Sequence, residues 1–121
     1  MVETYGMTHI ALAVADPLRS AAFYNEVFGC TTAFADESKA ELQTPGRHDV
    51  ISLERAETGV GAVGGVGHFG FRLVRPEDID AAVEAVLRAG GTVDKQGEFS
   101  PGFPFAFVRD LDGYMVEIWF E

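Results

Sequence analysis

Two of the three histidines in this chain occupy matching places in its two halves, and a glutamate lies close to its end. His9 and His68 each open an apolar, strand-like run, and Glu117 lies inside the last such run. Two neutral imidazoles and one carboxylate form a common ligand set for a divalent transition metal, and three protein ligands leave positions open for water and substrate. A lone histidine is more often a hydrogen-bonded side chain, and Glu117 alone can pair with Arg109. The repetition favours a metal site.

Strand periodicity predicts that the three side chains lie on equivalent faces. Alternate residues of a strand point to opposite sides of a sheet. The three runs alternate between an apolar face, which would pack against a helix, and a second face that carries His9, His68 and Glu117. We expect each of them to lie inside its strand among hydrophobic neighbours, where an unpaired charge is costly.

The elements that must position these residues follow one pattern, written twice. In each half a proline, Pro17 or Pro76, comes eight residues after the histidine and opens a helical pattern, with Asp16 as the cap of the first helix. The helices are predicted to stop at Gly29 and Gly90. Three short extended runs follow each helix, at about residues 31–35, 40–44 and 49–54, and at about residues 92–96, 105–109 and 114–120. Each half is therefore expected to be a strand, a helix and three strands.

Composition limits the classes of function. The chain has 121 residues and a net charge of −10, which argues against nucleic acid and against an anionic membrane surface as partners. Its hydrophobic content of 47% predicts a packed core, and no segment has the length of a membrane-spanning helix. The single cysteine, Cys30, cannot form an internal disulfide and is interpreted as buried and inert. We therefore expect a cytoplasmic protein.

Taken together, the motifs resemble the vicinal oxygen chelate superfamily, which includes glyoxalase I, extradiol dioxygenases, fosfomycin-resistance enzymes, methylmalonyl-CoA epimerase and bleomycin-binding proteins. The resemblance rests on residues 8–14, 23–24, 28–29 and 67–71, and most strongly on residues 107–119. It implies an α+β fold in which two βαβββ modules form an eight-stranded cup around a metal. The expected single domain, residues 1–121, has module one at about 7–56, a glycine-rich connector at about 58–67 and module two at about 68–121.

The resemblance also implies which residues hold the metal. A divalent ion, with Fe, Mn, Zn, Ni and Co all possible, is expected on His9, His68 and Glu117. Glyoxalase I and the epimerase add a glutamate or glutamine from the last strand of module one, where this chain has Ser52, or Glu54 on the same face. Serine is a poor ligand. The three-ligand pattern of dioxygenases and fosfomycin-resistance enzymes therefore fits better, unless Glu54 takes the fourth place.

Further residues are candidates for catalysis or substrate binding. Glu54 and His48 are candidate general bases beside Glu117, although Glu54 can also be a strand-end charge paired with a nearby arginine and His48 a solvated turn residue. Arg72 can clamp an anionic group or form a salt bridge at the rim. Phe107 and Trp119 are expected to line an aromatic pocket, although much of the aromatic content can be core.

The expected function is that of a metal-dependent enzyme of the glyoxalase or dioxygenase type. It would chelate a small substrate through vicinal oxygens for Lewis-acid or O₂ chemistry. The alternative is a non-catalytic protein that binds a ligand or an antibiotic, as bleomycin-resistance proteins do. Ser52, and Phe107 where extradiol enzymes carry a tyrosine, predict weak activity on catechols and on the methylglyoxal–glutathione adduct. The resemblance further implies a homodimer.

Overall fold

The computed structural model describes residues 1, 3, 5–46 and 48–121. The chain divides into two compact units, Met1–Val60 and Gly61–Glu121, and the division falls inside the glycine-rich connector expected at about residues 58–67. Each unit contains one sheet and one α-helix, and each is described by itself.

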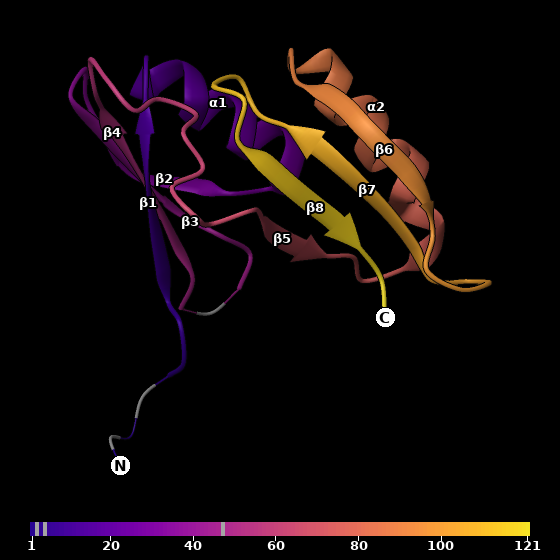
Figure 1. Cartoon of the computed structure of the whole chain (residues 1–121). Coiled ribbons are helices and arrows are strands. Elements are labelled where there is room, and N and C mark those ends of the chain that lie inside the picture. The colour runs from indigo at the N-terminus through magenta and orange to yellow at the C-terminus, as the bar shows by residue number, and fades with distance from the viewer. Residues whose placement is uncertain (2, 4, 47) are drawn as a thin grey trace. The chain divides into compact units, whose positions relative to one another are not determined.

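The first unit is a four-stranded sheet with a helix packed on it (Figure 1). Its elements are β1 (His9–Val14), α1 (Pro17–Phe28), β2 (Thr31–Ala35), β3 (Lys39–Gln43) and β4 (Val50–Arg55). The strand order is β1-β4-β3-β2, in which β1 runs parallel to β4 and the other neighbours are antiparallel. Helix α1 packs on β2, β3 and β4. The first and last strands of the module are thus direct neighbours.

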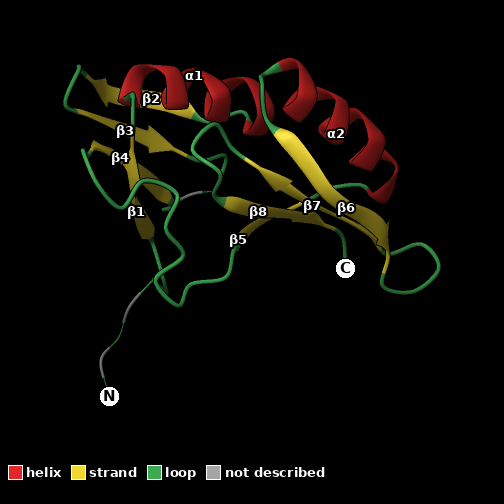
Figure 2. Cartoon of the chain, turned by 45° about the horizontal axis from the view of Figure 1, so that its top comes forward, coloured by secondary structure: helices red, strands yellow, loops and turns green. Residues whose placement is uncertain are grey.

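The second unit repeats this topology (Figure 2). Its elements are β5 (Phe69–Arg72), a 3₁₀ turn η1 (Pro76–Asp78), α2 (Ile79–Arg88), β6 (Thr92–Glu98), β7 (Pro104–Arg109) and β8 (Met115–Trp119). The strand order is β5-β8-β7-β6, with β5 parallel to β8 and the remaining pairs antiparallel. Helix α2 lies along β6 and β7 and touches β8. The α+β class and the two βαβββ modules are therefore confirmed.

Local sequence explains where the first helix begins and ends. The carboxylate of Asp16 accepts hydrogen bonds from the main-chain N–H groups of Leu18 and Arg19, at 3.1 and 3.2 Å, so two of the free donors of the first turn are satisfied. Pro17 takes the first helical position. Gly29 ends the helix with φ of 66°, in the left-handed region that glycine adopts without strain.

The burial of alternate residues confirms the predicted strand faces. Leu12 and Val14 of β1 are buried, while His9 and Ala11 are exposed. In β8, Val116 and Ile118 are buried against the helix side. The alternation arises because one face of each sheet packs against its helix, and removal of apolar area from water stabilises that face by roughly 25 cal/mol per Å².

Two histidines differ from the expected position inside a strand. His9 is the first residue of β1, and His68 immediately precedes β5. Strand β1 begins where its partner begins, since His9 pairs with Val50 at the start of β4. In β5 the ladder with β8 starts one residue after His68, at Phe69. Both histidines therefore lie at strand entrances rather than in strand interiors.

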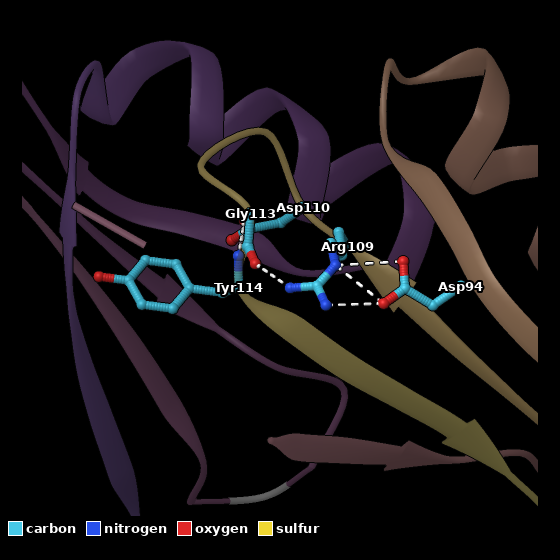
Figure 3. Close-up of polar contacts among 5 residues, drawn as sticks. All are labelled: Asp94, Arg109, Asp110, Gly113 and Tyr114. Carbon is cyan, nitrogen blue, oxygen red and sulfur yellow. Dashed lines mark hydrogen bonds and ion pairs between the residues drawn. The ribbon is translucent and has the colours of Figure 1, made fainter. Parts of the chain in front are cut away.

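The turn between β7 and β8 is organised by a buried aspartate (Figure 3). One carboxylate oxygen of Asp110 accepts hydrogen bonds from the main-chain N–H groups of Asp112 and Tyr114, at 3.0 and 2.9 Å. Arg109 donates to the carbonyl of Gly113 at 2.9 Å and forms an ion pair with Asp94 on β6 at 2.7 Å. These contacts fix the residue at which β8 begins.

The structure also describes the single cysteine and the lengths of the helices. Cys30 is buried, as expected, and desolvation raises its pKa to about 11, so the thiol stays protonated at neutral pH. Within the described residues, no helix is both long and apolar enough to span a bilayer.

The Asp110 turn generates a prediction about stability. Asp110→Ala leaves two main-chain donors without their acceptor in a buried turn, so we expect the free energy of unfolding to fall by about 1–3 kcal/mol. Asp110→Asn keeps one oxygen that can accept both hydrogen bonds, so its loss should be smaller. Urea unfolding followed by circular dichroism measures both variants. Equal stability of Asp110→Ala and the unmodified chain would contradict this role.

Candidate functional site

A histidine and a glutamate meet on the face of the second sheet that is turned away from α2. The Nε2 atom of His68 lies 3.3 Å from Oε2 of Glu117. The side chain of Glu117 is 17% exposed and that of His68 is 43% exposed. The carboxylate is thus largely removed from water, and the imidazole beside it remains accessible from solvent.

The parallel pairing of β5 with β8 brings these two residues together. Glu117 pairs with Gly70, and His68 lies two residues before Gly70 on the same face. A Cβ atom at Gly70 would lie 3.1 Å from the main-chain oxygen of Glu117 and 3.4 Å from Nε1 of Trp119, which is tight. The missing side chain therefore leaves room over β5 for its neighbours on β8.

Aromatic rings surround the pair. The His68 ring contacts Phe107 edge-on, with 5.2 Å between ring centroids, and Phe107 is the direct cross-strand partner of Glu117. Phe107 in turn contacts Phe105 at 5.6 Å, and Phe99 stacks on Phe105 at 4.4 Å. A carboxylate in such apolar surroundings is stabilised by a close cationic or metal partner.

Arg72 and Trp119 form a second contact on the same face. They are cross-strand partners, and the guanidinium carbon of Arg72 lies 5.7 Å from the centroid of the Trp119 ring. This is within the range of a cation–π interaction. No carboxylate of the described residues lies within ion-pair distance of Arg72, so the alternative role of Arg72 in a salt bridge at the rim is not observed.

The first unit has a hollow of about 310 Å³ on the corresponding face of its sheet. His9 and Glu54 both line it, together with His48. The remaining lining residues are Thr8, Ala11, Lys39, Glu41, Val50 and Ser52. Three of the predicted site residues of module one are therefore gathered around one cavity.

Hydrogen bonds and charges order the polar groups of this hollow. The Ser52 hydroxyl donates to Oε1 of Glu54 at 3.1 Å. Lys39 forms an ion pair with Glu41. The pKa of Lys39 is raised by its hydrogen bond to Glu41, with the charges of Glu41 and Glu54 acting in the same direction. The lysine is therefore a stable cation between two glutamates.

The registers of the two sheets show which residues are equivalent. In the first sheet Ala11 pairs with Ser52, and in the second Gly70 pairs with Glu117. Since each histidine lies two residues before the small residue, Ser52 occupies in module one the place of Glu117 in module two. The structure thus supports the alignment of Ser52, rather than Glu54, with the position of a fourth ligand.

The predicted site residues fall into two groups. Five of them lie on the open face of the second sheet, namely His68, Arg72, Phe107, Glu117 and Trp119, and the other three, His9, His48 and Glu54, line the hollow of the first unit. No three histidine, cysteine, aspartate or glutamate side chains of the described ranges are gathered as a metal-binding cluster. The ligand set that joins His9 to the second unit stays a prediction.

His48 occupies the turn position that the sequence offered as one of its two interpretations. It lies in a bend two residues before β4, and its exposed ring stacks on Tyr5 with 4.3 Å between centroids. The main-chain N–H of Thr44 donates a hydrogen bond across the loop to the carbonyl of Asp49, and the residue pairs between β3 and β4 begin at Val50. His48 is therefore a turn residue at the edge of the hollow.

Sequence reasoning missed Glu41 and Lys39 in the hollow and Lys95 on the second sheet. The first two alternate with the buried Ala40 and Leu42 in β3, a period-two pattern that would have revealed them. Lys95 gave no such signal, because a shift of register between Val93 and Lys95 reverses the face on which it lies.

Comparisons of the sequence with known proteins find a family and a relative that span most of the chain. A family model described as the Glyoxalase/Bleomycin resistance protein/Dioxygenase superfamily matches residues 6–118. A probable lactoylglutathione lyase of Vibrio parahaemolyticus is 33% identical, in an alignment that covers 91% of this chain and 86% of that protein.

Solved structures with similar folds are more distant in sequence. A fosfomycin resistance protein from Mesorhizobium loti has a TM-score of 0.79 at 18% identity, covering 98% of this chain and 94% of that one. A glyoxalase-related enzyme from Fulvimarina pelagi has a TM-score of 0.77 at 21% identity, covering 98% and 89%. These two support the fold alone. The family model and the Vibrio relative show that the chain belongs to the Glyoxalase/Bleomycin resistance protein/Dioxygenase superfamily.

Proposed function

We propose that this protein is a metal-dependent enzyme of the glyoxalase type, which binds a small substrate through neighbouring oxygens. The observation that carries the proposal is the pair formed by His68 and Glu117, a nitrogen and an oxygen donor side by side on an apolar sheet face. The name of the Vibrio relative, a probable lactoylglutathione lyase, supports an enzyme of this kind.

The donor pair fits a divalent metal. Two ligands at about 2.0–2.1 Å from a metal, at a tetrahedral or octahedral angle, are about 2.8–3.4 Å apart. The separation of 3.3 Å between Nε2 of His68 and Oε2 of Glu117 lies in this range. His9 is the proposed third ligand, equivalent to His68 in the repeat. A metal on these residues would supply Lewis-acid stabilisation of an oxyanion, or O₂ activation if it is iron.

The chain also offers groups that can hold or move a proton. Glu54 is fixed by the Ser52 hydroxyl, which donates to its Oε1 at 3.1 Å, and its side chain lines the hollow. We propose Glu54 as the general base, because a carboxylate oriented by a single donor retains lone pairs for a substrate proton. His48 stands at the edge of the same hollow, where its ring can relay a proton to solvent.

Substrate contacts are assigned to the second sheet. Phe107 and Trp119 flank Glu117 and would exclude water from one side of a bound molecule, while Arg72 offers a cation beside the Trp119 ring. Exclusion of water strengthens every charge interaction at the site. A reducing, cytoplasmic environment remains part of the proposal, because it would preserve the lone thiol of Cys30.

Metal content is the first test. Protein purified without chelator should carry about one divalent ion per chain, and His68→Ala or Glu117→Gln should lower the content to background because each removes one proposed ligand. His48→Ala is the matched control, since it removes a histidine outside the ligand set. Elemental analysis gives the result. Unchanged metal in His68→Ala would contradict the site, and purification without stoichiometric metal would favour the non-catalytic binding protein.

Substrate choice is the second test. The methylglyoxal–glutathione adduct is the first molecule to assay, because of the name of the Vibrio relative. We expect kcat/KM below about 10⁴ M⁻¹s⁻¹ for it and for catechol, since Ser52 stands in the place of a fourth ligand and Phe107 in that of an acid–base tyrosine. Ser52→Glu should raise the rate with the adduct and leave catechol unchanged. Efficient turnover of the adduct by the unmodified protein would contradict the proposal that Ser52 keeps this activity low.

A homodimer is also proposed, in which the family arrangement would let module one of one chain pair with module two of another. The glycine-rich connector between the two units is compatible with this pairing, since such a segment permits pairing within or between chains. Light scattering at micromolar concentration should give twice the chain mass of 13.1 kDa. A single-chain mass would contradict the dimer and leave the metal site untouched.

A further inference from the structure

The open face of the second sheet carries two basic side chains that lie over aromatic rings. The guanidinium carbon of Arg72 is 5.7 Å from the centroid of Trp119, and Nζ of Lys95 is 5.6 Å from the centroid of Phe105. Neither cation lies within ion-pair distance of a carboxylate in the part of the chain that the structure describes. In a chain with a net charge of −10, two such cations on one face are unusual.

Four other basic side chains of the described residues are paired with carboxylates. Arg109 lies on the same sheet face and forms an ion pair with Asp94 at 2.7 Å, and its pKa is raised by that hydrogen bond. Lys39, Arg75 and Arg88 also pair with carboxylates. The positive charges of Arg72 and Lys95 are therefore left available, while the neighbouring charge of Arg109 is neutralised.

The strand register places the two cations at opposite edges of an aromatic surface. One cross-strand row runs through Gly70, Glu117, Phe107 and Lys95, and the next runs through Arg72, Trp119, Phe105 and Gly97. We call Phe99, Phe105, Phe107 and Trp119 the aromatic floor. With strands about 4.8 Å apart, the backbones of Arg72 and Lys95 are separated by three strand spacings, about 14 Å across the sheet.

Glycines stand beside the floor at two of its corners. A Cβ atom at Gly97 would lie 3.2 Å from the Phe105 ring, just as one at Gly70 would crowd Trp119. Phe105 and Trp119 are direct cross-strand partners. Trp119 lies towards Gly70 on β5, and Phe105 lies towards Gly97 on β6. The two glycines allow these rings to lie across the neighbouring strands. Phe105 itself is only 6% exposed, so the accessible ring surface of the floor is that of Phe99, Phe107 and Trp119.

We propose that the aromatic floor binds the body of a planar aromatic substrate whose anionic group is held by Arg72 or Lys95. This inference rests on the proposed function, because the same face carries His68 and Glu117, and it adds the substrate class. A neutral apolar molecule would leave both cations unused, and a cationic one would be repelled by them. An aromatic carboxylate satisfies both the ring surface and the charge.

Trp119 supplies a direct readout, because it is the only tryptophan of the chain. Quenching of its fluorescence would be measured with 4-nitrobenzoate and with 4-nitrobenzamide, which share the ring and differ in charge. The protein is treated with chelator, so that the carboxylate cannot bind through a metal. We expect 4-nitrobenzoate to bind about tenfold tighter at low salt, as one charge-assisted hydrogen bond predicts, and the difference to shrink with added salt.

Variants identify the source of the preference. Arg72→Gln and Lys95→Gln should each reduce the ratio of the two dissociation constants, and the double variant should bring it to about one. Arg72→Lys keeps the charge and should retain part of the preference. Arg19→Gln is the matched control, since Arg19 is an exposed cation on α1 of the first unit, and its ratio should equal that of the unmodified chain.

Two results would overturn the inference: equal affinity for the two probes, or a ratio unchanged in the double variant. Metal content measured on the same variants separates this outcome from failure of the proposed function. Stoichiometric metal without anion preference removes only the substrate class. Anion preference without metal in the untreated protein supports the aromatic floor and contradicts the metal-dependent function.

Discussion

The parallel pairing of the first strand of each module with its last strand is the constraint on which the rest of the structure depends. It joins residues far apart in sequence, Gly70 with Glu117 and Ala11 with Ser52, and fixes which side chains share a face. Because side chains alternate along a strand, a slip of one residue would move Glu117 to the helix side and bury it in the core. The Asp110 turn protects this register, since it determines where β8 starts.

The two sheets have the same register but carry different side chains at equivalent positions. The same positions carry Ser52 and Glu41 in the first sheet and Glu117 and Phe107 in the second. The first module therefore offers polar groups around a hollow, and the second offers a largely buried carboxylate on an apolar floor. The two sheets thus share one topology and carry different chemical groups at equivalent positions. The family relationship extends over residues 6–118 and includes both modules.

Much of this could be predicted from the sequence, for physical reasons. The Asp16 cap and the stop at Gly29 are local signals, and the alternation around His9 and Glu117 depends only on period two. What could not be predicted depends on tertiary pairing. The bulge before Lys95 reverses its face, and the contact of Arg72 with Trp119 exists only because β5 lies beside β8.

The central claim is that two imidazoles and the carboxylate of Glu117 hold one divalent ion, and X-ray absorption spectroscopy of the zinc-loaded protein tests it most directly. The account predicts a first shell of nitrogen and oxygen at about 2.0–2.1 Å that includes the multiple scattering of two histidine rings. In His68→Ala, any bound zinc should show one ring fewer. A first shell of oxygen alone, or a spectrum identical in the two proteins, would contradict the claim.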